Sequence, residues 1–99
     1  ALICGNDVLA CGALHALSKL GIRVPDQMTV TGIGDFKGSR DFEPALTTVR
    51  IPARTIGAKA AQAIARLVTS DTDPDVGARV PPELTIRNTT APLREIIHR

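Results

Sequence analysis

An asparagine and an aspartate stand next to each other at Asn6 and Asp7, directly after a short apolar run. An asparagine amide supplies donors and an acceptor, and a carboxylate accepts hydroxyl protons, so the pair has the chemistry that recognition of hydroxyl groups requires. A structural interpretation exists as well, because Asn6 is a good helix N-cap and Asp7 would complement the positive end of the helix. The residues alone leave both interpretations open.

Two other groups of residues could carry chemistry, and neither completes a site. Cys11 and His15 are four residues apart on a predicted helix, but no second pair with ligand spacing accompanies this half of a metal site. His15 and Ser18 lack the nucleophile elbow and the oxyanion hole of a hydrolase. We therefore expect no metal, no cofactor and no catalytic residues, and hence no enzyme.

Three glycines at positions 32, 34 and 38 follow a predicted strand, as in a dinucleotide-binding fingerprint. Their spacing is G-x-G-x-x-x-G, one residue too long, and no helix follows before Pro44. A dinucleotide site needs the N-terminus of a helix to hold the pyrophosphate. We expect an ordinary turn at the carboxyl end of a strand instead.

The elements that must position these residues form a strand, helix, strand series. The apolar run at 1–4 predicts a buried strand, residues from Asp7 to Gly21 predict a helix, and the alternation at 28–33 predicts a second strand. Such a series is a βαβ unit with parallel strands. Ligands of open α/β sheets bind outside the carboxyl ends of the strands, where Asn6 and Asp7 lie.

The predicted helix has a broad apolar face, which is wider than packing on one sheet requires. We expect a second partner for it, and Gly12 in mid-helix indicates a close contact. The apolar residues that recur at helical spacing are Val8, Cys11, Leu14, Leu17 and Leu20.

The rest of the chain predicts a polar loop, then a strand and a helix, and finally a third strand. Residues 34–44 predict a loop without a regular element, 45–51 a short strand, and 52–69 a helix that begins at a proline. An acidic loop at 70–77 and a strand at 83–88 follow. The apolar face of the second helix contains Ile56, Ala60, Ala63, Ile64 and Leu67.

Length and composition limit the classes of function. With 99 residues that begin inside an apolar run, we expect part of a longer protein. No apolar run approaches the roughly 20 residues of a membrane span, and the net charge of +2 is scattered, which excludes a nucleic-acid patch within the chain. Aromatic residues make up 2%, too few for base stacking. Two cysteines indicate reduced thiols in a cytoplasmic protein.

Four segments in order resemble one family. Over Ala1 to about Pro92, the chain is similar to the carboxyl-terminal part of a LacI/GalR-family transcriptional regulator. The segments are CGNDVLACGALHALSKLGIRVPD (4–26), TVTGIGDF (29–36), PALTTVRIP (44–52) and PPELTIRNTTAP (81–92), and an Ile-Gly pair at Gly57 lies between the last two.

The resemblance implies part of an α/β effector domain of the type I periplasmic-binding-protein-like fold, with parallel βαβ units from two lobes. Residues 1–38 and 80–92 would form the carboxyl-side lobe, 42–75 the amino-side lobe and 93–99 a tail. A sugar, sugar acid or nucleobase would bind between the lobes. The DNA-binding headpiece of the family would lie outside this chain, so operator DNA would be a partner only through that headpiece.

The resemblance also implies effector-binding positions. Asn6 matches a polar contact in sugar-binding members, and Asp7 matches one in the purine-binding member. Gly34 stands where many relatives have an acidic ligand, so either Asp35 replaces it or the contact is lost. Ala53 matches an aromatic residue that flanks the sugar in a relative. Alanine does not provide that aromatic wall, so other residues would line the pocket here. The G-x-G-D-F turn is similar to that of gluconate-type repressors, which favours a sugar acid.

The family forms dimers, and Cys11 and Phe42 match positions at the subunit interface. With Val8 and His15 on the same predicted helix, they would form a homodimer contact. The implied function is that of a cytoplasmic bacterial regulator, in which the effector shifts an equilibrium of lobe closure and alters DNA binding. The alternative is a solute-binding protein of a sugar transport system, which shares the fold. Neither function involves membrane insertion of this chain.

Overall fold

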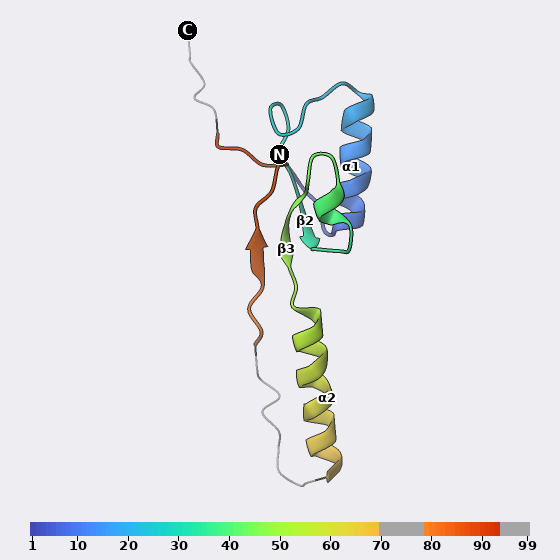
Figure 1. Cartoon of the computed structure of the whole chain (residues 1–99), viewed down its shortest axis with the longest axis vertical. Helices are drawn as coiled ribbons and strands as arrows, with labels where there is room; N and C mark the ends of the chain where they lie inside the picture. Colours follow the sequence, from blue (N-terminus) through green and yellow to red (C-terminus); the bar gives the residue numbers. More distant parts are fainter. Residues whose placement is uncertain (70–78, 94–99) are drawn as a thin grey trace. The chain divides into compact units, whose positions relative to one another are not determined.

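The computed structural model describes residues 1–69 and 79–93 (Figure 1). The chain divides into two compact units, and each is described by itself. The first unit is Ala1–Arg50 with Leu84–Arg99, and the second is Ile51–Glu83. In order, the elements are β1 (Leu2–Ile3), α1 (Asp7–Lys19), β2 (Val30–Gly34), the 3-10 helix η1 (Ser39–Asp41), β3 (Thr47–Arg50), α2 (Ala53–Thr69) and β4 (Glu83–Thr85).

A sheet whose first three strands are parallel forms the centre of the first unit. β1 pairs with β2, and β2 pairs with β3, in the strand order β1-β2-β3-β4. α1 connects β1 to β2 and lies alongside β2 (Figure 1). The predicted βαβ unit is confirmed, because β1 and β2 pair in parallel and α1 is the crossover connection between them.

The core of the first unit lies between α1 and the sheet. Full burial of one leucine side chain in this core stabilises the fold by roughly 1.5–3 kcal/mol. The helix ends as predicted, with Gly21 in the left-handed region at a φ of 71°. The buried apolar residues are Ala10, Leu14, Leu17, Val30 and Leu46.

The buried stripe of α1 covers only part of its apolar face, and the second partner predicted for the remainder stays a prediction. Val8 is 67% exposed, Leu20 is 72% exposed, and Cys11 is exposed as well. The sheet of this chain lies along one side of the helix, so only the stripe at 7, 10, 14 and 17 is buried. The predicted close contact at Gly12 is absent within the described residues, since no atom lies within 4 Å of a Cβ built there.

The polar loop that follows β2 contains one regular element, contrary to the prediction for residues 34–44. The turn of η1 is closed by hydrogen bonds from the amide of Ser39 to the carbonyl of Phe36 (2.9 Å) and from Asp41 to Gly38 (2.8 Å). A single 3-10 turn leaves no helical periodicity in the sequence. It was therefore missed.

The last strand is shorter than the predicted range of 83–88. β4 ends at Thr85, and the next residues form hydrogen bonds outside a regular ladder. The amide of Arg87 donates to the hydroxyl oxygen of Thr47, and the amide of Asn88 donates to the carbonyl of Ala45, both at 2.9 Å. A side-chain acceptor thus replaces the backbone acceptor that would continue a strand.

The second unit contains the helix predicted at 52–69, observed as α2. The residues of its predicted apolar face are largely exposed, with Ile56 at 41% and Ile64 at 61%. In the described part of this unit, no residue of α2 is buried. The predicted loop at 70–77 and most of the predicted tail at 93–99 lie outside the described residues. The boundary between the two predicted lobes lies before β3, at residues 38–42, whereas the two compact units divide after β3, at residue 50. The assignment of the lobes stays a prediction.

None of the described helices combines the length and apolar character that crossing a bilayer requires.

Candidate functional site

The carboxyl ends of the parallel strands bring together residues from distant parts of the sequence. β1 leads into Asn6 and Asp7, β2 leads into Gly34 and Asp35, and β3 ends at Arg50. Gly34 and Arg50 are partners in the strand register. This edge is where open parallel sheets bind ligands.

Asn6 is the N-cap of α1, as predicted. Its Oδ1 accepts a hydrogen bond of 2.9 Å from the amide of Leu9, with extended backbone angles at the cap. The side-chain nitrogen has no partner among the described residues. Capping therefore uses the acceptor of the amide and leaves its donors available to a ligand.

Asp7 is 1% exposed, and its own chain surrounds the carboxylate. Oδ2 accepts from the amide of Phe36 at 3.0 Å and from the hydroxyl of Ser39, while Oδ1 accepts from the hydroxyl of Thr48 at 2.6 Å. A buried carboxylate needs such donors, because an unpaired one would be strongly destabilising. Here Asp7 joins the start of α1 to the loop after β2 and to β3.

Asp35 forms an ion pair with Arg87 at 2.8 Å between Oδ1 and Nη2. The two side chains are 10% and 12% exposed, so water screens this pair weakly. The other described ion pair, between Arg23 and Asp26, is exposed. Asp35 also has a φ of 54°, a left-handed conformation that aspartate tolerates better than most residues.

Gly34 has a φ of 127°, a conformation that strongly favours glycine. A Cβ at this position would also overlap the ring of Phe36, which folds back over the glycine. Phe36 is 45% exposed. The turn thus presents an aromatic edge in place of a side chain at residue 34.

Arg50 lies on the same face of β3 as Thr48, because side chains two residues apart point to one face of a strand. That face is the one toward α1, since Thr48 reaches Asp7. The side chain of Arg50 is exposed, and it has no hydrogen bond or ion pair with a described residue. Lys37, in the loop after β2, is also exposed and without a described partner.

The remaining predicted residues lie elsewhere. Ala53 is the first residue of α2, in the second unit, and is exposed. Val8, Cys11 and His15 are exposed on α1, whereas Phe42 is half-buried and packs against the core of the first unit. Their role in a dimer contact stays a prediction.

Sequence analysis missed Arg87, Ser39 and Thr48 as partners of the two aspartates. One signal was present for Arg87, which is the only charged residue between Leu84 and Pro92. The segment around it is largely exposed, with Leu84 at 63% and Ile86 at 71%, so this signal did not identify the partner. Nothing in the sequence distinguished Ser39 or Thr48 from other hydroxyl residues.

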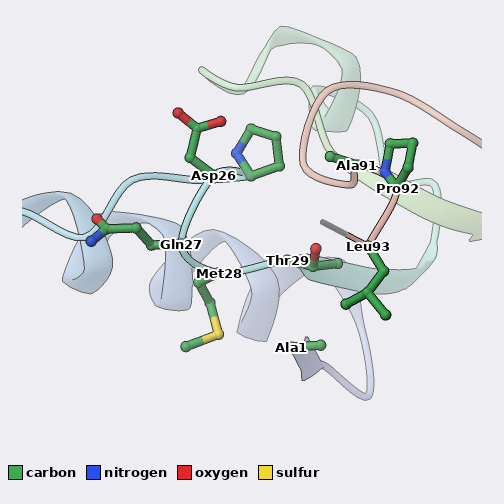
Figure 2. A pocket seen from close by; sticks show the side chains of 9 residues that line it. Ala1, Asp26, Gln27, Met28, Thr29, Ala91, Pro92 and Leu93 are labelled. Atoms are coloured by element: carbon green, nitrogen blue, oxygen red, sulfur yellow. The ribbon is translucent and has the colours of Figure 1, made fainter. Parts of the chain in front are cut away.

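The described pockets lie away from this edge. A pocket of about 380 Å³ is lined by residues that precede β1 and β2 and by residues 91–93, so it lies at the amino ends of the strands (Figure 2). A second pocket of about 290 Å³ lies by the end of α1, between Leu14 and Pro44. Among the described residues, no three metal-ligating side chains gather in one place.

Comparison with known proteins connects this architecture to a family. Residues 1–90 match the family model of the periplasmic binding protein-like domain. The HTH-type transcriptional repressor PurR of Yersinia enterocolitica is 38% identical over 92 residues, which cover 92% of this chain and 27% of the repressor.

Two solved structures share the fold. The transcription regulator GntR from Chromobacterium violaceum has a TM-score of 0.84 and 36% identity, covering 90% of this chain and 33% of that one. A LacI family regulator from Arthrobacter in complex with lactose has a TM-score of 0.79 and 28% identity, covering 90% and 34%. This chain thus spans about a third of the length of these regulators or less. It belongs to the periplasmic binding protein-like domain family, and its homologues are LacI-family transcriptional repressors.

Proposed function

We propose that this chain is the effector-binding and dimerisation part of a bacterial transcriptional regulator that responds to a small sugar or sugar acid. Operator DNA would be bound by a headpiece elsewhere in the full-length protein, and the protein would act in the cytoplasm. The named relatives support this function, since PurR is a repressor and the Arthrobacter regulator was crystallised with lactose. A solute-binding role in transport shares the fold but has no such relative among them.

The observation that carries the proposal is the side-chain amide of Asn6 at the carboxyl edge. Its donors have no partner in the described part of the chain while its acceptor caps α1, so it can donate to a hydroxyl oxygen without loss of the cap. Ala53, in the second unit, stays a sequence-based candidate for the same site.

Local charge favours the sugar acid over the neutral sugar. Both aspartates of this edge are engaged internally, Asp7 by three donors and Asp35 by Arg87. Arg50 and Lys37 are exposed cations without described partners. An arginine at this edge can donate two parallel hydrogen bonds to a carboxylate.

Calorimetry on the full-length protein tests this function, with lactose, gluconate and hypoxanthine as probes of the three effector classes. We expect gluconate to bind, and Arg50→Gln to weaken it by about tenfold, as loss of a charge-assisted hydrogen bond predicts. Arg40→Gln removes another exposed cation from the same unit and serves as the matched control.

Other outcomes separate the alternatives. If lactose binds and Arg50→Gln does not change its affinity, the effector is a neutral sugar and not a sugar acid. If only hypoxanthine binds, the effector is a nucleobase and neither a sugar nor a sugar acid. If no probe binds, and the full-length protein fails to retain any fragment of bacterial DNA in a mobility-shift assay, the regulator function is wrong.

A further inference from the structure

The segment through which the chain re-enters the first unit is fastened along β3. This segment, residues 84–90, follows directly after the second unit. Besides the amides of Arg87 and Asn88, the hydroxyl of Thr89 donates to the carbonyl of Val30 (2.6 Å) and accepts from the amide of Thr47 (2.9 Å). The return segment, as we call it, is thus held at the start of both β2 and β3.

Arg87 extends this attachment to the carboxyl edge of the sheet. Its Nη1 donates to the carbonyl of Leu46 at 3.0 Å, and its Nη2 donates to Asp35 at 2.8 Å. One guanidinium therefore joins the return segment, the start of β3 and the turn after β2. Lysine would retain the charge but has a single nitrogen, without the planar fork whose two nitrogens contact Leu46 and Asp35 separately.

The turn after β2 is held from two directions. The amide of Phe36 donates to Asp7 at the start of α1, and the side chain of Asp35 is held by Arg87. In the same turn, Gly34 and Asp35 both have positive φ angles. Such conformations persist where surrounding contacts fix them, so displacement of one anchor changes the turn.

We propose that Asp35 and Arg87 are positioning residues that couple the turn after β2 to the return segment. The proposal rests on the proposed function, in which an effector binds at this turn. Effector binding then acts on the segment that connects the two units, because the ion pair makes the turn and the segment move together. Asp35 serves this coupling through Arg87, and its Oδ1 is not the ligand of the effector.

Hydrogen exchange tests the coupling without any effector. In the full-length protein, Asp35→Asn retains a residue that tolerates a positive φ and removes the charge. We expect the amides of Arg87 and Asn88 to exchange at least about threefold faster, since loosening of the return segment raises its local opening. Asp41→Asn, which removes an exposed charge from η1, is the matched control. Unchanged exchange in Asp35→Asn overturns the coupling whether or not an effector is known.

A second measurement separates coupling from plain stabilisation. With gluconate as the probe, the ratio of its affinities for the free and the DNA-bound protein reports the coupling between the two sites. We expect Asp35→Asn and Arg87→Lys each to weaken this coupling, so that the ratio of the two affinities comes about fivefold closer to one. A change of this size is within the usual range of allosteric coupling. Arg87→Lys retains the charge and keeps the test valid if a neutral variant fails to fold.

The outcomes are distinguishable from failure of the proposed function. An unchanged ratio in both variants, with lowered thermal stability, would make the pair purely structural and overturn the proposal. Loss of gluconate binding in Asp35→Asn but not in Arg87→Lys would make Asp35 a direct ligand and also overturn it. A wild-type protein that binds neither gluconate nor DNA rejects the function, and hydrogen exchange then decides the coupling alone.

Discussion

The carboxylate of Asp7 occupies the space that a side chain at Gly32 would fill. A Cβ built on Gly32 would overlap Oδ1 and lie 3.3 Å from Cγ of Asp7, with Leu46 at 3.0 Å on another side. The glycine in β2 thus allows a carboxylate from the start of α1 to reach across the sheet to Thr48 in β3. Loss of either residue disturbs the same buried contact.

Gly32→Ala is expected to lower the free energy of unfolding by about 1–3 kcal/mol, because the added methyl group overpacks a filled site. Urea denaturation of the full-length protein measures the change. Gly57→Ala is the control, since a Cβ at this exposed helical position meets nothing within 4 Å, and a gain of about 0.5–1 kcal/mol is expected. Equal effects of both substitutions would contradict the close approach of Asp7.

Asp7→Asn is expected to cost about 1–3 kcal/mol of stability, because an amide replaces one of two acceptor oxygens and leaves buried donors without a partner. Denaturation measures the loss, and the exposed Asp41→Asn should change stability by less than about 0.5 kcal/mol. If Asp7→Asn leaves stability intact and abolishes effector binding, Asp7 is a ligand, as the purine-binding resemblance implied.

Two substitutions at Asn6 separate its cap from its proposed ligand contact. Asn6→Ala removes both and should cost about 1 kcal/mol of stability, whereas Asn6→Ser retains a capping oxygen and removes the amide donors. We expect Asn6→Ser to weaken effector binding in calorimetry while thermal unfolding stays near that of the wild type. Undiminished affinity in both variants would remove Asn6 from the site.

The exposed stripe of α1 is expected to contact a second subunit. Val8→Asp in the full-length protein should weaken dimerisation by about tenfold or more, because it buries an unpaired charge in the contact. Sedimentation velocity over a concentration series measures the dimer. Ala16→Asp places the same charge on a different exposed side of α1 and should leave the dimer intact. Indistinguishable sedimentation of both variants would move the interface elsewhere.

Local sequence signals predicted the backbone around the site well. The N-cap at Asn6, the glycine after α1 and the parallel βαβ unit each depend on residues within one or two elements, and all three are confirmed. The η1 turn and the early end of β4 were missed. Their hydrogen bonds involve single turns or side-chain acceptors, which leave no periodic pattern.

The sequence by itself determined that a polar corner follows a short strand and opens a helix, since apolar runs, caps and glycines act locally. The expectation that this strand is buried was wrong, because Leu2 is 39% and Ile3 is 83% exposed. It left open whether Asn6 and Asp7 serve a ligand or the fold. Only the tertiary structure decided where the carboxylates are used, through contacts from Asp7 to Thr48 and from Asp35 to Arg87. These partners are 41 and 52 residues apart, and such distances are closed by the packing of the whole sheet rather than by spacing along the chain.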